Sequence, residues 1–233
     1  KGARARAAYR RAYKHNVVGL VARALAPGLK YDPNGFVDQG RFEASGIFDH
    51  FDKYLGDDLL QGDLNGIPLA MSELEVSYSV PGDSSECPVF HGLFMRFEAS
   101  RRLKHRTVVI PKSTKDLIGP LLVRLLKVRN TKRRKMPVAL EVPDFAKLFE
   151  CSSTDQVESR KILTPRMMEK ILELQKILNA PLALSFTPGG VYAAIWFSRR
   201  LFEPRMGSAL ISFTDLKKMA DLLGLPAQVV QRF

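Results

Sequence analysis

The sequence predicts an α+β protein, an antiparallel β-sheet with helices packed on it, and three observations lead to that prediction. Two apolar runs, 182–186 and 191–197, flank the turn sequence Thr-Pro-Gly-Gly at 187–190, which is typical of a β-hairpin. Segment 164–178 starts with Thr-Pro, a helix cap followed by proline, and then repeats apolar residues every three or four positions. Residues 3–26 show a similar spacing with a basic face.

Residues 3–26 predict a basic amphipathic helix that ends before Pro27-Gly28. Its apolar stripe would consist of Tyr9, Tyr13, Val17, Leu20, Val21 and Ala24. Such a helix can lie on a membrane surface, bind nucleic acid as an arm, or pack on the protein as an outer helix.

An antiparallel meander is expected next in the chain. Residues 31–35 are rich in turn formers, and 41–55 contribute core aromatics. The alternating strand 68–79 would pair in a hairpin through the glycines between 62 and 66. Two further strands are predicted at 89–99 and 106–111.

The second half predicts a helix at 114–129, a strand at 138–142, a short helix at 145–149 and a helix at 215–223. Leu172 of the helix at 165–178 is expected to be buried against the sheet.

Four regions follow from this order: a juxtamembrane-type helix at 1–30, a mainly β lobe at 31–118, a basic connector at 119–137 and an α+β lobe at 138–233. A single compact domain over 31–233 is the alternative.

Charge is distributed in blocks along the chain. Residues 1–30 hold eight Lys/Arg and no Asp/Glu, whereas 31–95 hold two against twelve, and 96–135 hold fourteen against two. Acidic and basic blocks can pair within the fold, or the basic ones can face an anionic surface. We interpret the basic blocks as contacts for anionic lipid or an acidic protein segment, with charged ends outside the core. The residues in this set are Arg4, Arg6, Arg10, Arg11, Lys14, Arg101, Arg102, Lys104, Arg106, Lys132, Arg133, Arg134 and Lys135.

Nucleic acid is the alternative partner for the same basic blocks, with Phe90, Phe94 and Phe97 as candidate base-stacking residues. A metal-dependent hydrolase is a further alternative, because one stretch concentrates oxygen ligands suited to a hard cation. Those residues are Asp49, His50, Asp52, Asp57, Asp58, Asp63, Glu73 and Glu75. Their spacing matches no calcium loop, and a negatively charged surface explains them equally well. The sequence contains no recognisable catalytic motif, so we expect no enzyme and no cofactor. Cys87 and Cys151 are expected to be free thiols in a reducing compartment.

Several phrases together resemble one bacterial family. The most specific are the Ser-Glu-Leu strand at 72–74, the F-x-G-L-F strand at 90–94 and the segment DQVESRKILTPRMM at 155–168. The family consists of membrane-associated proteins known only as a domain of unknown function. The resemblance implies an anchor ahead of Lys1, at the cytoplasmic face of the bacterial inner membrane. It supplies no catalytic residue, and the expected function is therefore a membrane-tethered binding or scaffold domain.

Overall fold

The computed structural model describes residues 2–48, 50–79, 82, 86–99, 102–112, 136–138, 141–198 and 200–204, with 217, 220, 221 and 224. Within these residues, nine strands form one antiparallel sheet in the order β1-β2-β3-β4-β9-β8-β5-β7-β6. The strands are β1 (Leu29–Asp32), β2 (Lys53–Leu64), β3 (Ile67–Ser79), β4 (Glu86–Phe97), β5 (Thr107–Pro111), β6 (Met136–Pro137), β7 (Phe149–Ser153), β8 (Leu182–Thr187) and β9 (Gly190–Trp196).

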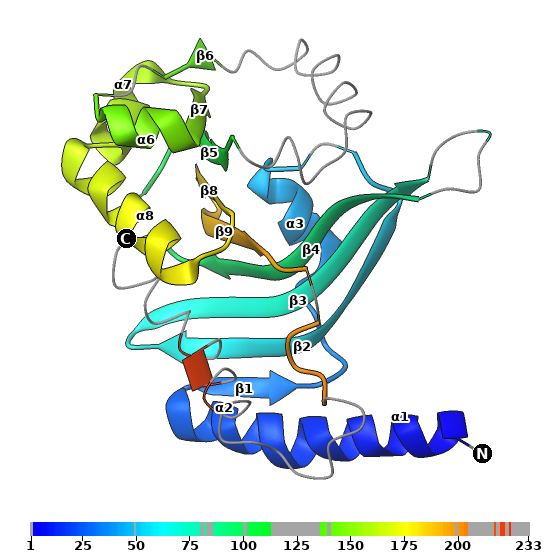
Figure 1. Cartoon of the computed structure of the whole chain (residues 1–233). Coiled ribbons are helices and arrows are strands. Elements are labelled where there is room, and N and C mark those ends of the chain that lie inside the picture. The colour runs from blue at the N-terminus through cyan, green and yellow to red at the C-terminus, as the bar shows by residue number, and fades with distance from the viewer. Residues whose placement is uncertain are drawn as a thin grey trace.

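The described helices fall into two groups along the chain, one within residues 2–45 and one within 143–178 (Figure 1). They are α1 (Gly2–Tyr13), the π-helix η1 (Lys14–Val18), α2 (Gly19–Leu25), α3 (Gln39–Ser45), α6 (Pro143–Leu148), α7 (Gln156–Ile162) and α8 (Pro165–Leu178). The predicted α+β class is confirmed. None of the described helices is long and apolar enough to cross a membrane.

The sheet joins segments that lie far apart in the sequence. β4 pairs with β9, so that Leu93 faces Ile195, although the two strands are separated by about a hundred residues of chain. The predicted hairpin at 187–190 is confirmed as the β8–β9 turn. Both faces of these central strands are buried, which explains why they are continuously apolar instead of alternating.

Helices cover the sheet on both faces. Side chains of α1, α2, α6 and α8 belong to one core cluster, together with Ala193 and Ile195 of β9. Side chains of α3 and the following loop belong to a second cluster, together with Ala194 and Trp196. The alternation along β9 therefore divides the core into two layers, one on each face.

α8 follows the sequence rules closely. The Thr164 hydroxyl accepts a hydrogen bond from the Met167 N–H, and Asn179 ends the helix in the left-handed conformation. The helix buries Met168, Ile171 and Leu174. Leu172 is only half-buried, so the expectation that it is fully buried is wrong, although it packs against the same core cluster.

The N-terminal helix differs from the prediction in its packing. Each turn of a π-helix takes in one residue more than a turn of an α-helix, so η1 shifts the buried stripe by one position. The buried apolar side chains include Tyr13, Val18 and Ala22, whereas Val17 and Val21 are half-buried.

Other elements depart from the sequence prediction locally. The 31–35 turn cluster begins inside the short strand β1. β2 starts at Lys53, inside the segment 41–55 expected to contribute core aromatics, and it forms the predicted hairpin with β3. The segment 138–142 is not a strand over its described residues; β6 precedes it. The predicted helix 114–129 and nearly all of the connector 119–137 lie outside the described residues, as does most of 215–223.

Candidate functional site

A β-bulge in β2 places two consecutive carboxylates on one ammonium group. The pairing of β2 with β3 shifts between Asp57 and Leu60, and Asp58 has a positive φ of 59°. In a regular strand, neighbouring side chains point to opposite faces. Here Asp57 Oδ2 lies 2.7 Å and Asp58 Oδ2 lies 2.6 Å from Lys14 Nζ. The bulge therefore anchors the N-terminal helices to the sheet.

Two further side chains, Tyr31 and Glu203, complete this arrangement. The Tyr31 hydroxyl of β1 donates to Asp58 Oδ1. Glu203 Oε1 lies 3.3 Å from Lys14 Nζ and also contacts the Arg10 guanidinium. We refer to Lys14, Tyr31, Asp57, Asp58 and Glu203 as the Lys14 cluster. Lys14 is 5% exposed and Asp58 only 1%.

The pKa values in the Lys14 cluster reflect competition between burial and charge. Burial disfavours the charged form of Lys14, but the attraction of Asp58 and Asp57 outweighs it, and the pKa of Lys14 is raised. Burial raises the pKa of Asp58 to about 7, with repulsion from Asp57 adding to it and the attraction of Lys14 opposing it.

The pKa values of Lys14 and Asp58 are both raised, whereas a simple ion pair would raise the pKa of the lysine and lower that of the aspartate. The difference follows from burial, which is the largest influence on Asp58 and outweighs the attraction of Lys14. The ammonium of Lys14 faces three carboxylates, and their attraction outweighs its own burial. We therefore interpret Lys14 as charged and Asp58 as the group that takes up a proton.

The basic residues predicted for the N-terminal helix separate into two sets. The expectation that the charged ends lie outside the core is wrong for Lys14, because its ammonium is the centre of a buried ionic cluster. Arg10 is half-buried beside Glu203 and Asp57. Arg4, Arg6 and Arg11 are exposed.

The second basic block lies elsewhere on the molecule. Arg106 Nη2 donates to the Ala44 carbonyl at the end of α3, so this side chain links α3 to the start of β5. The backbone N–H of Lys104 donates to Glu158, and the Lys104 and Arg102 side chains are exposed. The other predicted contacts lie outside the described residues: Arg101, Lys132, Arg133, Arg134 and Lys135.

The acidic residues considered for a metal site have other partners in the described structure. Asp57 and Asp58 do converge, and with Glu203 they could offer three oxygen atoms, but Lys14 Nζ bonds to them. Three other carboxylates accept hydrogen bonds from backbone N–H groups: Asp52 from Ser79, Asp63 from Gly66 and Glu73 from Leu201. Glu75 forms an ion pair with Arg200. Asp49 lies outside the described residues.

The aromatic residues considered for base stacking are core residues. Phe90, Phe94 and Phe97 are each at most 1% exposed. Phe90 and Phe94 pack in the α3 layer, whereas Phe97 lies in the opposite layer. None of the three rings can therefore reach a nucleic-acid base while the domain is folded.

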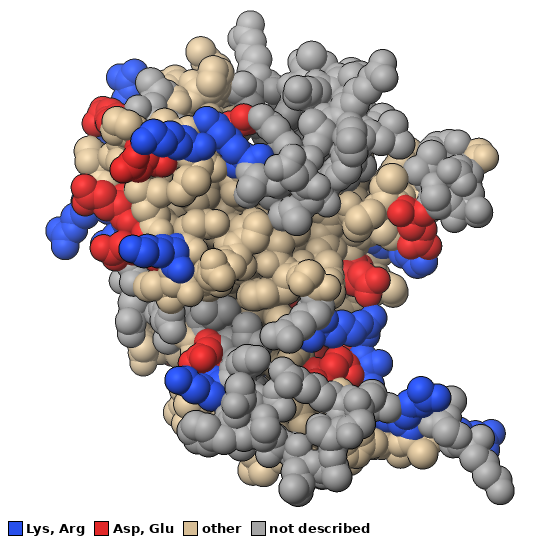
Figure 2. All heavy atoms as spheres, viewed as in Figure 1, with Lys and Arg blue, Asp and Glu red and all other residues tan. Residues whose placement is uncertain are grey.

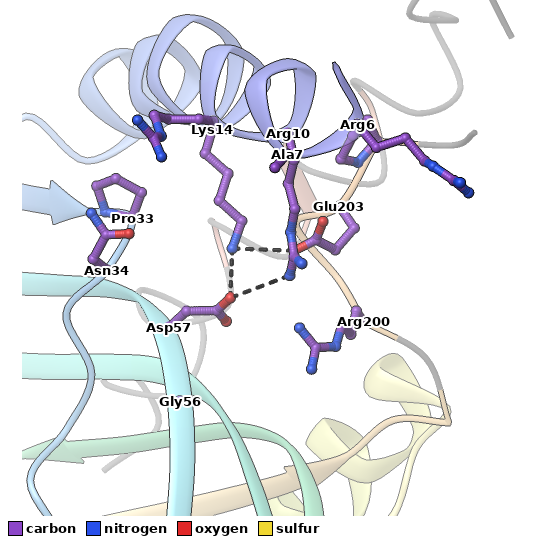
Figure 3. Close-up of a pocket in the computed structure, with 12 residues that line it drawn as sticks. Arg6, Ala7, Arg10, Lys14, Pro33, Asn34, Gly56, Asp57, Arg200 and Glu203 are labelled. Atoms are coloured by element: carbon purple, nitrogen blue, oxygen red, sulfur yellow. Dashed lines mark hydrogen bonds and ion pairs between the residues drawn. The ribbon is translucent and has the colours of Figure 1, made fainter. Parts of the chain in front are cut away.

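A cleft of about 860 Å³ opens beside the Lys14 cluster, beneath α1 (Figure 3). Lys14 and Arg10 point from the helix toward Asp57, and Arg200 lies on the opposite side. The lining residues are Arg6, Ala7, Arg10, Arg11, Lys14, Pro33, Asn34, Gly56, Asp57, Arg200, Glu203 and Pro204. The cleft thus combines three segments of the chain: the N-terminal helix, the β1–β2 region and residues 200–204.

Sequence reasoning missed Tyr31, Arg200 and Glu203. Tyr31 reaches the Lys14 cluster through the pairing of β1 with β2, and Arg200 and Glu203 reach the cleft through the path of residues 200–204. The adjacent pair Asp57-Asp58 was the only local signal, because two successive acids in a strand need a reason to share one face.

Comparison with known proteins gives a family but no activity. No curated protein matches the chain. A crystal structure of the mycobacterial trehalose monomycolate transport factor A, TtfA, aligns over 92% of this chain and 96% of that chain, with 11% sequence identity and a TM-score of 0.48. Residues 88–233, more than half of the chain, match the model described as "Protein of unknown function (DUF3137)". The expected kind of family is thereby confirmed, and the chain belongs to the DUF3137 family of proteins of unknown function.

Proposed function

We propose that this chain is a non-enzymatic binding domain that docks on an anionic membrane surface through α1, at the cytoplasmic face of the bacterial inner membrane. The observation that carries the proposal is the exposure of α1 itself. Residues 4–9 are all exposed, and the helix buries none of its described side chains before Tyr13. Figures 1 and 2 show this end of α1 projecting from the rest of the molecule.

Composition suits such a helix for contact with anions. α1 reads GARARAAYRRAY, which combines strong helix formers with four arginines and no acidic residue. The side chains of Arg4, Arg6 and Arg11 are exposed, and Tyr9, 43% exposed, adds a ring of the kind enriched at the headgroup level of membranes. Each basic residue close to an anionic leaflet contributes about 1 kcal/mol.

The Lys14 cluster attaches the C-terminal end of α1 to the sheet. Lys14 bonds to Asp57 and Asp58 of β2 at the point where α1 passes into η1. A helix held in this way presents its arginines without the ordering cost that a flexible arm would incur. Rigid presentation favours a surface contact and supports a role in tethering or scaffolding.

The alternatives have weaker support. A nucleic-acid-binding role would lack its stacking residues, because Phe90, Phe94 and Phe97 are buried. A metal-dependent hydrolase would need carboxylates that Lys14 already engages. The resemblance to membrane-associated proteins and the basic character of α1 both favour the cytoplasmic side of a membrane, where basic flanking residues are retained.

Vesicle flotation tests the proposal. The wild-type chain should float weakly with vesicles containing anionic lipid, should ignore neutral vesicles, and should be released at high salt because the Debye length shortens. The triple variant Arg4→Gln, Arg6→Gln, Arg11→Gln should lose binding and stay folded. Lys14 is left unchanged because it is structural.

A matched control removes three exposed cations from α7 and α8: Arg160→Gln, Arg166→Gln, Lys176→Gln. It changes the net charge by the same amount and should float like wild type. Equal flotation of the α1 variant and wild type would refute the proposal. So would binding of RNA or DNA that is lost in the α1 variant while flotation persists.

A further inference from the structure

We propose that the cleft beneath α1 is a binding site for the phosphate group of a phosphate ester, with Arg10 and Arg200 as the principal ligands. The inference deepens the proposed function, on which it rests for the expectation that an anionic surface lies against the same helix.

The basic side chains outnumber the acidic ones in the cleft lining. Five cations line it, Arg6, Arg10, Arg11, Lys14 and Arg200, against the two carboxylates of Asp57 and Glu203. Both carboxylates are already bonded to Lys14 and Arg10. Asp58 and Glu75 stand behind the lining and pair with Lys14 and Arg200. The excess of positive charge therefore belongs to the side chains that line the cleft and face a ligand.

Arg10 and Arg200 are held in place but remain open to a ligand. Carboxylates fix one side of each guanidinium: Glu203 and Asp57 for Arg10, and Glu75, 2.9 Å away, for Arg200. Their side chains are nevertheless 41% and 47% exposed. A guanidinium has five N–H donors, so each keeps donors beyond those its partner uses.

Pre-positioned guanidinium groups suit phosphate in particular. Their fork of donors matches two oxygens of a phosphate, and fixing the side chain in advance reduces the entropy lost on binding. The short segment 200–204 is itself secured, because the Leu201 N–H donates to Glu73 and Glu203 meets Arg10 and Lys14. The ligand would therefore bridge this segment and α1.

The size of the cleft favours a phosphate ester over inorganic phosphate as the ligand. Its volume of about 860 Å³ falls within the usual range for organic ligands, roughly 300–1,000 Å³. Ala7, Pro33 and Pro204 give part of the lining an apolar character that suits the remainder of the molecule. The same phosphate chemistry could come from a lipid headgroup or from a soluble ester.

Calorimetric titration with glycerol phosphate and with inorganic phosphate tests the site. Wild type should bind glycerol phosphate, and Arg200→Gln should weaken that binding by about tenfold or more, since a charge-assisted contact is lost. Arg41→Gln is the matched control: Arg41 is 50% exposed and also pairs with a carboxylate, Asp38, but lies outside the cleft. Denaturation curves should show both variants folded.

Flotation of the same variants separates the two sources of phosphate and the two proposals. If Arg200→Gln loses both glycerol phosphate and anionic vesicles, the ligand is a headgroup; if it loses only glycerol phosphate, the ligand is a soluble ester. Either result supports the site. Failure of wild type to bind glycerol phosphate, or equal binding by Arg200→Gln and wild type, overturns it, whatever flotation shows for α1.

Discussion

Replacement of Lys14 by methionine is the sharpest test of how the N-terminal helix is held. Methionine keeps an unbranched apolar stem of similar length but removes the ammonium group. Asp57, Asp58 and Glu203 would then face one another without their central cation. The helix would lose its ionic attachment to β2 while its small apolar contacts, through Tyr13 and Val18, remain.

The burial of Asp58 sets the size of the stability loss expected for Lys14→Met. Asp58 is 1% exposed, so it cannot exchange its partner for water without movement of the backbone. Removing one member of a buried ion pair typically costs about 3–5 kcal/mol. The pKa of Asp58 is already about 7, so proton uptake relieves part of the penalty at neutral pH and places the expected loss near the lower limit. For a chain of this length the melting temperature should fall by roughly 6–12 °C.

Thermal and urea denaturation of wild type, Lys14→Met, Lys14→Met/Asp58→Asn and the exposed control Lys176→Met provide the assay. The double variant also removes the Asp58 carboxylate that Lys14→Met leaves unpaired, and it should recover about 1 kcal/mol or more of the lost free energy of unfolding. The control should stay within about 0.5 kcal/mol of wild type. A Lys14→Met midpoint indistinguishable from that of Lys176→Met would refute the reasoning and make the Lys14 cluster dispensable for stability.

Two other predictions concern titratable groups. The folded-state pKa of Asp58, about 7, lies above its ordinary value of 3.8, so its contribution to stability is complete below pH 4 and is lost as the pH rises through 7. The free energy of unfolding of wild type, measured relative to Asp58→Asn, should therefore fall between about pH 4 and 7 and level off above that; a flat difference would contradict the assignment. Burial raises the pKa of the Cys151 thiol to about 12, whereas Cys87 is half-buried. Ellman titration should find one fast thiol in the native protein and two after unfolding, and two fast native thiols would place Cys151 at the surface.

Local sequence rules predicted the elements whose determinants are adjacent in the chain. Thr164 caps α8 and Pro165 begins it, because a hydroxyl and a fixed φ act within one turn. The hairpin at 187–190 forms where its turn residues stand. The basic helix was predicted because its spacing and composition lie within a single segment.

Tertiary structure decided what those rules could not reach. The four-residue strand β1 follows from its pairing with β2 and not from its own turn-rich sequence. The π-helix moves the buried stripe from Val17 to Val18, a change of one residue that no periodicity resolves. The expected basic arm consequently contains both a structural cation and exposed ones.

The candidate site depends most on long-range structure. Lys14, Tyr31, Asp58 and Glu203 come from four separate segments, and nothing near any of them in the sequence marks the others as neighbours. The spacing and composition of residues 3–26 were enough to predict a basic N-terminal helix. The sheet, with the bulge that turns two successive aspartates toward Lys14, decided which basic residues of that helix are buried and which stay exposed. A charge that is buried and paired is no longer available for binding.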